Sequence, residues 1–319
     1  MYNIGIDLGG TNIAVAIVTE TGEIVRKGST PTLNDRKYDA IVKDMAELCM
    51  KLMAEEGLKT EDIHSVGIGS PGTPDPVHGV IVYANNLHFN NAPIRQEFQK
   101  YLNLPVYVEN DANVAALGEY ESGAGKLYKD FVAITLGTGV GSGIIIDRKI
   151  ISGSWYGGAE VGHMVIQYGG EPCTCGRKGC WEAYSSATGL IRDAKKAAKE
   201  NPKSAMNTLL EGNLEKMNAK IPFDAAQKGD KVAQEVIDSY IGHLAVGLVN
   251  VINIFQPEII VLGGGVSAQR ENLIIPLKKK IVDEIYGGEA AFKTKIEIAQ
   301  LGNDAGIIGA AMLYKINEV

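Results

Sequence analysis

Two stretches of the sequence repeat one pattern: an apolar strand, a glycine-rich turn and a second apolar strand. The first copy, IGIDLGGTNIAVAIVTETGEIV, begins at Ile4, and the second, FVAITLGTGVGSGIIIDRKII, begins at Phe131. When the copies are aligned, Gly9 falls opposite Gly137, and a polar turn follows the second strand of each. Because strands and helical patterns alternate between the copies, the repeat predicts a duplicated α/β domain with an intervening cleft.

Length, charge and apolar segments limit the class of protein. A chain of 319 residues is long enough for two domains, and its net charge of −7 argues against general nucleic-acid or membrane-surface binding, so we expect neither partner. The longest apolar region, 241–262, contains polar residues and a proline, which predicts a core helix followed by a strand. Asp7 interrupts the first apolar run and no basic segment precedes it, so we expect a cytoplasmic protein without a signal peptide.

Three glycine-rich turns follow apolar strands: DLGGT (7–11), LGTGVGSG (136–143) and LGGGV (262–266). None completes a P-loop or the dinucleotide motif G-x-G-x-x-G. Glycine lets the backbone approach a phosphate closely, although any one of these turns could be only a tight hairpin. Three such turns, one with an acidic residue, favour a nucleotide site that comprises the following residues: Asp7, Gly9, Gly10, Thr11, Asn12, Gly137, Thr138, Gly139, Gly263, Gly264 and Gly265.

Asp7 is the acidic residue, at a strand end beside the first turn. A carboxylate next to phosphate-binding amides repels phosphate unless a cation intervenes. Asp7 therefore predicts Mg²⁺, held through water because this ion sheds its hydration reluctantly. The alternative is a turn-forming aspartate that bonds to its own backbone.

The chain has four cysteines, and three of them lie close together at Cys173, Cys175 and Cys180. A disulfide, a redox centre, a metal site or coincidence could each explain the cluster. A reducing compartment argues against a disulfide, and His163, shortly upstream, can supply the fourth ligand of a tetrahedral Zn²⁺ site. The residues therefore favour structural zinc, and Cys49, inside a helical pattern, is expected to be a buried core thiol.

Four segments of the chain resemble the ROK family of bacterial sugar kinases and repressors: DLGGTNIAVAIV, VENDANVAALGE, LGTGVGSGIIIDRKIISGSWYGGAEVGHM and CTCGRKGCWEAYSSATGL. The likeness continues to GNDAGIIGAAML near the end, and the glucokinase branch is the best fit. The repeated units and the late LGGGV resemble the two phosphate motifs and the adenosine motif of the actin, hexokinase and sugar-kinase superfamily. The resemblance implies an α/β fold of duplicated ribonuclease H-like domains of the actin and hexokinase type.

The resemblance also leads to expected domain limits. We expect a small N-terminal α/β domain at residues 1–117, completed by a C-terminal helix at about 303–319. A large C-terminal α/β domain at residues 118–302 would carry the zinc loop at 163–182. The pair Asn303-Asp304 is a plausible N-cap for the last helix.

The pair Asn110-Asp111 stands where a strand becomes a helix. Taken alone, the pair is explained by helix capping, which both residue types do well. The ROK resemblance implies instead that Asp111 is the catalytic base, which accepts the proton of a sugar hydroxyl as that oxygen attacks the γ-phosphorus of ATP. We expect the helix N-terminus to keep Asp111 ionised.

The resemblance further implies which residues bind the sugar and the metal. The sugar contacts would be Asn86, Asn110, Asp111, Glu160, His163 and Glu182, with a turn role for Asn86 equally open. Gly-His followed by Cys-x-Cys-Gly-x-x-Gly-Cys implies zinc on His163, Cys173, Cys175 and Cys180. If His163 binds zinc through one ring nitrogen, the other can point at the sugar. Glycines around Glu160 and His163 favour a loop there over a helix.

The expected function is therefore ATP-dependent phosphorylation of a hexose at its 6-hydroxyl, with glucose as the first choice and Mg-ATP as the donor. Fructose, N-acetylmannosamine, N-acetylglucosamine or allose are alternative acceptors within the family. A DNA-binding ROK regulator would need an N-terminal helix-turn-helix domain, for which the first strand, starting by about Asn3, leaves no room. An actin-like ATPase would not need the sugar carboxylates or the zinc loop. Family habit implies a homodimer or homotetramer.

Overall fold

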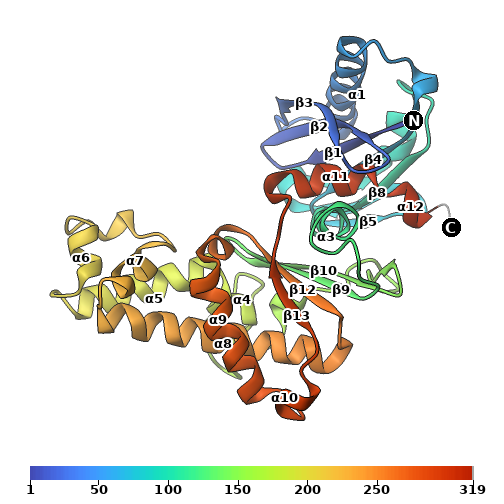
Figure 1. Cartoon of the computed structure of the whole chain (residues 1–319). Helices are drawn as coiled ribbons and strands as arrows, with labels where there is room; N and C mark the ends of the chain where they lie inside the picture. Colours follow the sequence, from blue (N-terminus) through green and yellow to red (C-terminus); the bar gives the residue numbers. More distant parts are fainter. Residues whose placement is uncertain (318–319) are drawn as a thin grey trace. The chain divides into compact units, whose positions relative to one another are not determined.

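The computed structural model describes residues 1–317, which form two compact units (Figure 1). Unit 1 comprises Met1–Val132, Gly143–Ala159 and the C-terminal segment from Gln300. Unit 2 comprises Ala133–Ser142 and Glu160–Ala299. Two five-stranded mixed sheets with surrounding helices confirm the predicted α/β fold class.

The sheet of unit 1 has the strand order β3-β2-β1-β4-β8. Its strands, in chain order, are β1 (Tyr2–Leu8), β2 (Asn12–Thr19), β3 (Ile24–Pro31), β4 (Ile63–Ser70) and β8 (Val106–Asn110). The first three strands form the predicted antiparallel meander, whereas β1, β4 and β8 run parallel. Because the carboxyl ends of parallel strands meet at one edge, the polar residues that end β1 and β8 are brought to the same edge of the sheet.

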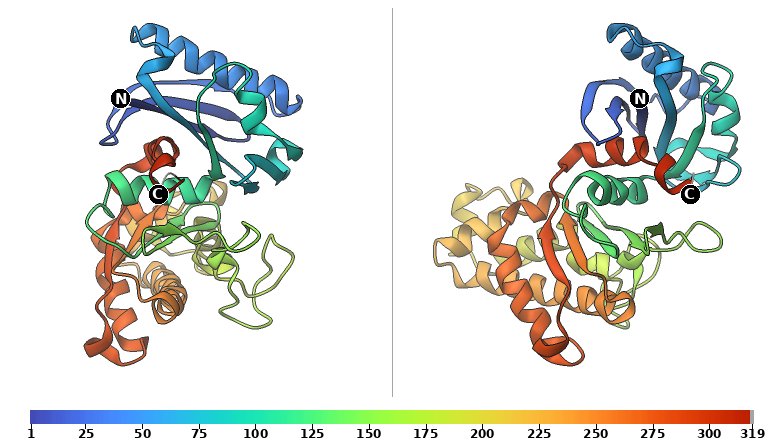
Figure 2. Two further views of the ribbon diagram at one scale, coloured as in Figure 1. Left: turned by 90° about the vertical axis from the view of Figure 1, so that its right-hand side faces the viewer. Right: turned by 45° about the vertical axis from the view of Figure 1, so that its right-hand side comes forward.

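Helices cover both faces of this sheet (Figures 1 and 2). On one face lies α1 (Tyr38–Glu55), whose buried side includes Cys49, as the helical pattern predicts. On the other lies α11 (Ala305–Ala311), beside α3 (Asp111–Ser122). A small sheet and a short helix complete the unit: β5 (Thr73–Asp75), β6 (Val80–Ala84), β7 (Phe89–Ala92) and α2 (Ile94–Phe98).

The second five-stranded sheet has the order β11-β10-β9-β12-β13. Its strands are β9 (Phe131–Leu136), β10 (Val140–Ile146), β11 (Lys149–Ile150), β12 (Ile259–Gly263) and β13 (Lys295–Ile298). The helices of unit 2 are α4 (Trp181–Ser185), α5 (Ala187–Glu200), α6 (Ala205–Leu209), α7 (Ile221–Gln227), α8 (Lys231–Phe255), α9 (Glu271–Glu284) and α10 (Gly288–Ala291). Single 3₁₀ turns occur at η1 (Thr60–Asp62), η2 (Asn85–Leu87), η3 (Val161–His163), η4 (Leu214–Lys216), η5 (Gly265–Gln269) and η6 (Gly302–Asp304).

The long helix α8 corresponds to the first part of the longest apolar region. In the described part of the chain it is the one helix long and apolar enough to cross a membrane, and 56% of its most apolar window is buried within the protein. It ends at Phe255, and the next residue, Gln256, is its C-cap in the left-handed conformation, before Pro257 and strand β12. This is the predicted succession of a core helix and a strand.

The C-terminal helix differs from the prediction. It is divided into α11 and a separate α12 (Tyr314–Asn317), and residues 318–319 of the expected helix lie outside the described residues. Asp304 is the N-cap residue of α11, at the predicted position, but its side chain makes no capping hydrogen bond and instead accepts hydrogen bonds of 3.0 and 3.2 Å from Lys27 Nζ. Lys27 lies on β3, so its ion pair with Asp304 connects the start of α11 to an edge strand of the sheet. The sequence around Asp304 gives no sign of this contact.

Helix α11 approaches its neighbours at backbone distance. A methyl group on Gly67 of β4 would overlap the carbonyl oxygen of Ala310, and one on Gly309 would overlap the carbonyl oxygen of Val114 in α3. Side chains at these two positions would push α11 away from both β4 and α3. The absence of Cβ atoms is therefore what lets the helix, the sheet and α3 pack together.

Replacement of Gly67 by alanine should lower the free energy of unfolding of unit 1 by about 2–3 kcal/mol, since the new methyl overlaps main-chain atoms. Urea unfolding measures this. The matched control is Gly242→Ala in α8, where a Cβ meets nothing within 4 Å. That change should stabilise by about 1 kcal/mol through helix propensity. Equal effects of the two substitutions would contradict the packing account.

Candidate functional site

The first glycine turn, Gly9–Thr11, joins β1 to β2 in unit 1. The Gly9 amide donates to the carbonyl of Asn12 at 3.0 Å, which closes the turn. Asn86 lies beside it, because a Cβ on Gly10 would be 3.3 Å from the Asn86 Cβ. Asn34 holds this segment by donating from Nδ2 to the Asn86 carbonyl at 2.8 Å. The structure thus brings together four predicted nucleotide residues and one predicted sugar residue.

Asp7 lies at the carboxyl edge of the parallel strands, next to Gly69 of β4, which in turn pairs with Glu109 of β8. Burial raises the pKa of Asp7, and the negative charge of Asp111 raises it further. Within residues 1–317 the Asp7 carboxylate accepts no hydrogen bond from its own turn, which argues against the turn-forming alternative. Two mutually repelling carboxylates at one strand edge fit a hydrated divalent cation.

Asn110 and Asp111 differ in what their side chains bind, although the sequence left helix capping and catalysis open for both. Asn110 is the N-cap of α3: its Oδ1 accepts from the amides of Ala112 and Asn113 at 2.9 and 3.3 Å. Its Nδ2 donates to the Gly72 carbonyl at 3.0 Å. The Asp111 Oδ1 accepts from the Ala112 amide at 2.8 Å, and the residue is exposed to solvent. The cap is therefore Asn110, and Asp111 keeps an oxygen for other chemistry.

Two opposing effects act on the pKa of Asp111. Surrounding protein raises the pKa of its carboxyl, and the backbone hydrogen bonds at the helix start only partly oppose this rise. Desolvation therefore outweighs the helix N-terminus. A raised pKa makes the carboxylate a better proton acceptor, which suits a base.

Glu109 is a buried carboxyl that the sequence reasoning missed. Its Oε1 accepts from the Asn110 amide at 2.8 Å and from Nδ2 of Asn113 at 3.0 Å. It thus braces the strand end and the first turn of α3 around Asp111. Burial raises the pKa of Glu109 despite these two bonds. An acidic residue within the apolar strand LPVYVEN is the signal that could have identified it.

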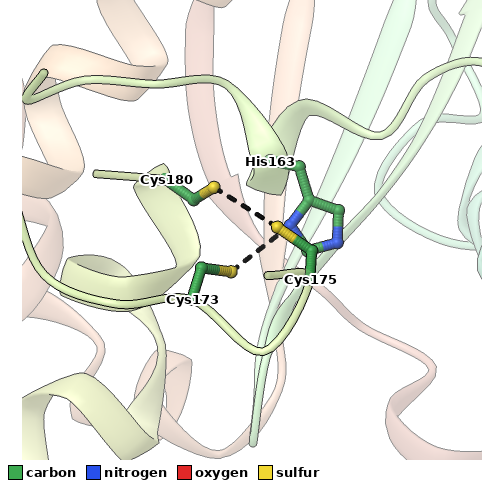
Figure 3. Close-up of side chains that lie close together, drawn as sticks. All are labelled: His163, Cys173, Cys175 and Cys180. Carbon is green, nitrogen blue, oxygen red and sulfur yellow. Dashed lines mark hydrogen bonds between the residues drawn. The ribbon is translucent and has the colours of Figure 1, made fainter. Parts of the chain in front are cut away.

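The four predicted zinc ligands form a cluster in unit 2 (Figure 3). Their ligand atoms all lie within 4.8 Å of one another. His163 Nδ1 is 3.7 Å from the Cys173 sulfur, and the sulfurs of Cys175 and Cys180 are 3.6 Å apart. All four cysteines of the chain are free, so the disulfide alternative is wrong. Three thiols and an imidazole fit a closed tetrahedral zinc site without an open position for water.

Glu160 directly precedes the single 3₁₀ turn η3 and His163 is its last residue; the rest of the segment is irregular, so the predicted loop is confirmed. The Glu160 residue is exposed, and its carbonyl accepts from the His163 amide at 3.0 Å. Because Nδ1 of His163 faces the thiols, Nε2 is the nitrogen left for a second partner.

Glu182 connects the zinc loop to the second glycine turn. Its Oε2 accepts from the Val140 amide at 3.0 Å, and its Oε1 accepts from the Thr174 hydroxyl at 3.2 Å and from the Cys173 thiol at 3.5 Å. Thr174 stands between two of the predicted metal ligands. The two oxygens of Glu182 therefore join the loop of the predicted metal ligands to β10 at the end of the turn.

The second and third glycine turns lie together in unit 2. The Gly137 amide donates to the Gly139 carbonyl at 3.0 Å. A Cβ on Gly264, which has a left-handed φ of 82°, would collide with the backbone of Leu136, directly before the second turn. The structure therefore brings the predicted residues Gly137–Gly139 and Gly263–Gly265 side by side. Asp7, Asn86, Asn110 and Asp111 belong to unit 1, and the assembly of both sets into one site stays a prediction.

Comparison with known proteins identifies the family. A sequence model of the ROK family matches residues 3–317. The chain belongs to the ROK family. A glucokinase of Thermotoga maritima is 38% identical to it over 315 residues, which cover 98% of this chain and 96% of the relative. The crystal structure of a ROK family glucokinase from Streptomyces griseus, in complex with glucose and AMPPNP, has 36% identity and a TM-score of 0.78, covering 98% of this chain and 99% of that one.

ROK regulators are less similar to this chain than these kinases are. A xylose repressor of Caldicellulosiruptor bescii is 29% identical over 306 residues, which cover 96% of this chain and 76% of the repressor. The ROK chain described here therefore has its stronger similarity on the glucokinase side of the family, as its motifs predict.

Replacement of Glu109 by glutamine should stabilise the protein at neutral pH, because one amide oxygen can accept both bonds now made to Oε1 and no buried charge remains. The raised pKa of Glu109 means that wild-type stability falls as pH rises through that pKa. The gain in unfolding free energy should thus grow from near zero below about pH 4 to about 1 kcal/mol at about pH 7. Thermal unfolding across this range tests it, with exposed Glu235→Gln as the control; a gain that shrinks with rising pH would contradict it.

Proposed function

We propose that this ROK protein is an ATP-dependent sugar kinase that phosphorylates a hexose at the 6-hydroxyl, converting glucose to glucose 6-phosphate. The observation that carries the proposal is the near full-length similarity to glucokinases, one of which holds glucose and AMPPNP in its crystal structure. Fructose, N-acetylmannosamine, N-acetylglucosamine and allose remain the alternative acceptors within the family.

In the proposed reaction Asp111 is the base. Its carboxylate takes the proton of the sugar 6-hydroxyl as that oxygen bonds to the γ-phosphorus, the bond from the γ-phosphorus to the bridging oxygen breaks, and ADP leaves. Since phosphoryl transfer depends mainly on positioning and on charge neutralisation, a modestly strengthened carboxylate is sufficient. Mg²⁺ bound with ATP supplies neutralisation of the phosphate charge. Asp7, near the Asp111 charge, is the residue proposed to hold this ion through water.

The sugar is proposed to bind through paired acceptors and donors. Asn110 has its amide fixed between α3 and Gly72, which makes it a rigid partner. Glu160 and the Nε2 atom of His163 are the free groups beside the metal cluster. Glu182, whose two oxygens already accept protein donors, would add a sugar hydroxyl to that network. Asn86 is the weakest member, because only its backbone contacts are evident.

We further propose that His163, Cys173, Cys175 and Cys180 hold a structural Zn²⁺ ion, which shapes the loop without taking part in chemistry. We also propose a cytoplasmic homodimer or homotetramer, with ATP and a hexose as partners and with neither nucleic acid nor membrane. Light scattering measures the oligomeric state. A DNA-binding assay at physiological salt should detect no specific complex, and a specific complex would favour the regulator alternative.

The direct test is ADP release with a panel of hexoses. Asp111→Asn should lower kcat by about a thousandfold and leave the Kd for MgATP nearly unchanged, because the base acts only in the transition state. Asp283→Asn, at an exposed site on α9, is the matched control. If no sugar raises turnover above an Asp111→Ala background, the kinase proposal fails. Sugar-independent ATP turnover would favour an actin-like ATPase.

Metal removal tests the zinc proposal. Elemental analysis should find about one zinc per chain, which Cys175→Ser abolishes and Cys49→Ala retains, because Cys49 is a buried core thiol outside the cluster. Chelation should weaken glucose binding by about tenfold or more before it unfolds the protein, since His163 would lose its orientation. A zinc-free protein with full sugar affinity would contradict the proposed coupling.

A further inference from the structure

Hydroxyl groups from outside the first two glycine turns hold the carbonyls of those turns. We infer that Thr32 and Thr188 are positioning residues for the nucleotide: each fixes a turn so that its free amides are oriented for phosphate before ATP arrives. This inference rests on the proposed function, because it assigns phosphate to these turns. It adds two residues that lie outside every glycine motif of the chain.

The first turn is held by Thr32, a fully buried residue directly after β3. Its hydroxyl donates to the Gly9 carbonyl at 2.7 Å, and its amide donates to the Thr11 carbonyl at 3.0 Å. Both carbonyls are therefore turned toward Thr32. The peptide planes on either side of the turn are fixed by a residue 23 positions away in the chain.

The second turn is held by the start of α5. The Thr188 hydroxyl donates to the Thr138 carbonyl at 2.7 Å, and the Ala187 amide donates to the Gly137 carbonyl at 2.8 Å. The hydroxyl and the carbonyl come from residues 50 positions apart. The third turn has a local version of the same contact, in which the Ser267 hydroxyl donates to the Gly264 carbonyl at 2.7 Å.

These contacts leave other backbone groups unused. Within residues 1–317, four amides next to the carbonyls held by Thr32 and by the start of α5 donate to no protein acceptor. They are the amides of Gly10, Thr11, Thr138 and Gly139. Consecutive free amides in a fixed turn form an anion-binding concavity. Glycine-rich segments otherwise lose much conformational entropy when they bind, so fixing them beforehand increases affinity.

The two threonines are not products of the internal repeat. Gly9 and Gly137 align in the two copies, but Thr32 follows a strand of the first meander whereas Thr188 begins a helix after the zinc loop. Different elements therefore supply a hydroxyl bond of 2.7 Å to each of the two aligned turns, although the acceptor carbonyls, Gly9 and Thr138, lie one position apart in the alignment. The internal repeat does not explain why both turns are held by a threonine hydroxyl. We infer that each turn needs its carbonyls fixed.

Valine replaces threonine with the same branched shape and no hydroxyl, and serine keeps the hydroxyl. We expect Thr32→Val and Thr188→Val each to raise the Kd for MgATP by about threefold to tenfold, while each serine variant stays within about twofold of wild type. The Kd for adenosine, which has no phosphate, should not change. Isothermal titration of the full chain without sugar provides these values, and Thr208→Val, at an exposed helical threonine, is the control.

Thr32 is buried and its valine variant can lose stability, but Thr188 is exposed, so Thr188→Val tests the inference in a folded protein. Unchanged MgATP affinity in Thr188→Val would overturn the inference. Equal weakening of ATP and adenosine, or serine variants as weak as the valine variants, would also overturn it, because either result indicates a general structural role. Failure of wild type to bind MgATP would refute the proposed function itself, and the inference with it.

Discussion

The close packing of α11 against β4 and α3 is the constraint on which unit 1 depends. With no Cβ on Gly67 or Gly309, the helix lies at backbone distance from the sheet and from α3 at the same time. That fixes α3 relative to the parallel strands, and α3 starts at Asp111. The position of the proposed base is therefore determined by main-chain contacts of α11 with β4 and with Val114 in the first turn of α3.

Side-chain hydrogen bonds to the backbone also fix the strand ends, the start of α3 and the glycine turns. Asn110 caps α3 and holds Gly72, Glu109 braces the start of α3, and Thr32 holds the first glycine turn. In unit 2, Glu182 joins the metal loop to Val140. These side chains act on backbone groups, so the glycine turns and strand ends are fixed although they have few side chains of their own. Such preorganisation fits the proposed phosphoryl transfer, which depends on positioned groups.

Much of this architecture could be predicted from the sequence. The repeated strand and turn pattern gives the α/β class, and three cysteines with an upstream histidine predict a cluster that the structure brings within 4.8 Å. These features are local in sequence, or are carried by residue types with few alternative uses. The proposed role of Asp111 comes from the family resemblance, because its position alone does not distinguish a base from a cap.

The rest depends on long-range geometry. Asp304 stands at the predicted N-cap position, but nothing near it in the sequence indicates that Lys27 of β3 binds its carboxylate in place of a capping bond. Thr32 and Thr188 resemble ordinary turn and helix threonines, because their acceptors are carbonyls, which every residue has. The pKa of Asp111 is raised because burial, which only the fold determines, outweighs the helix N-terminus.

Phosphorus NMR of the protein incubated with MgATP and glucose tests the central claim most directly, because it identifies where the phosphoryl group goes. The account predicts that ADP and a phosphate ester on the 6-oxygen of glucose form together in equal amounts. Inorganic phosphate in place of the ester, or unchanged ATP with every hexose offered, would contradict it.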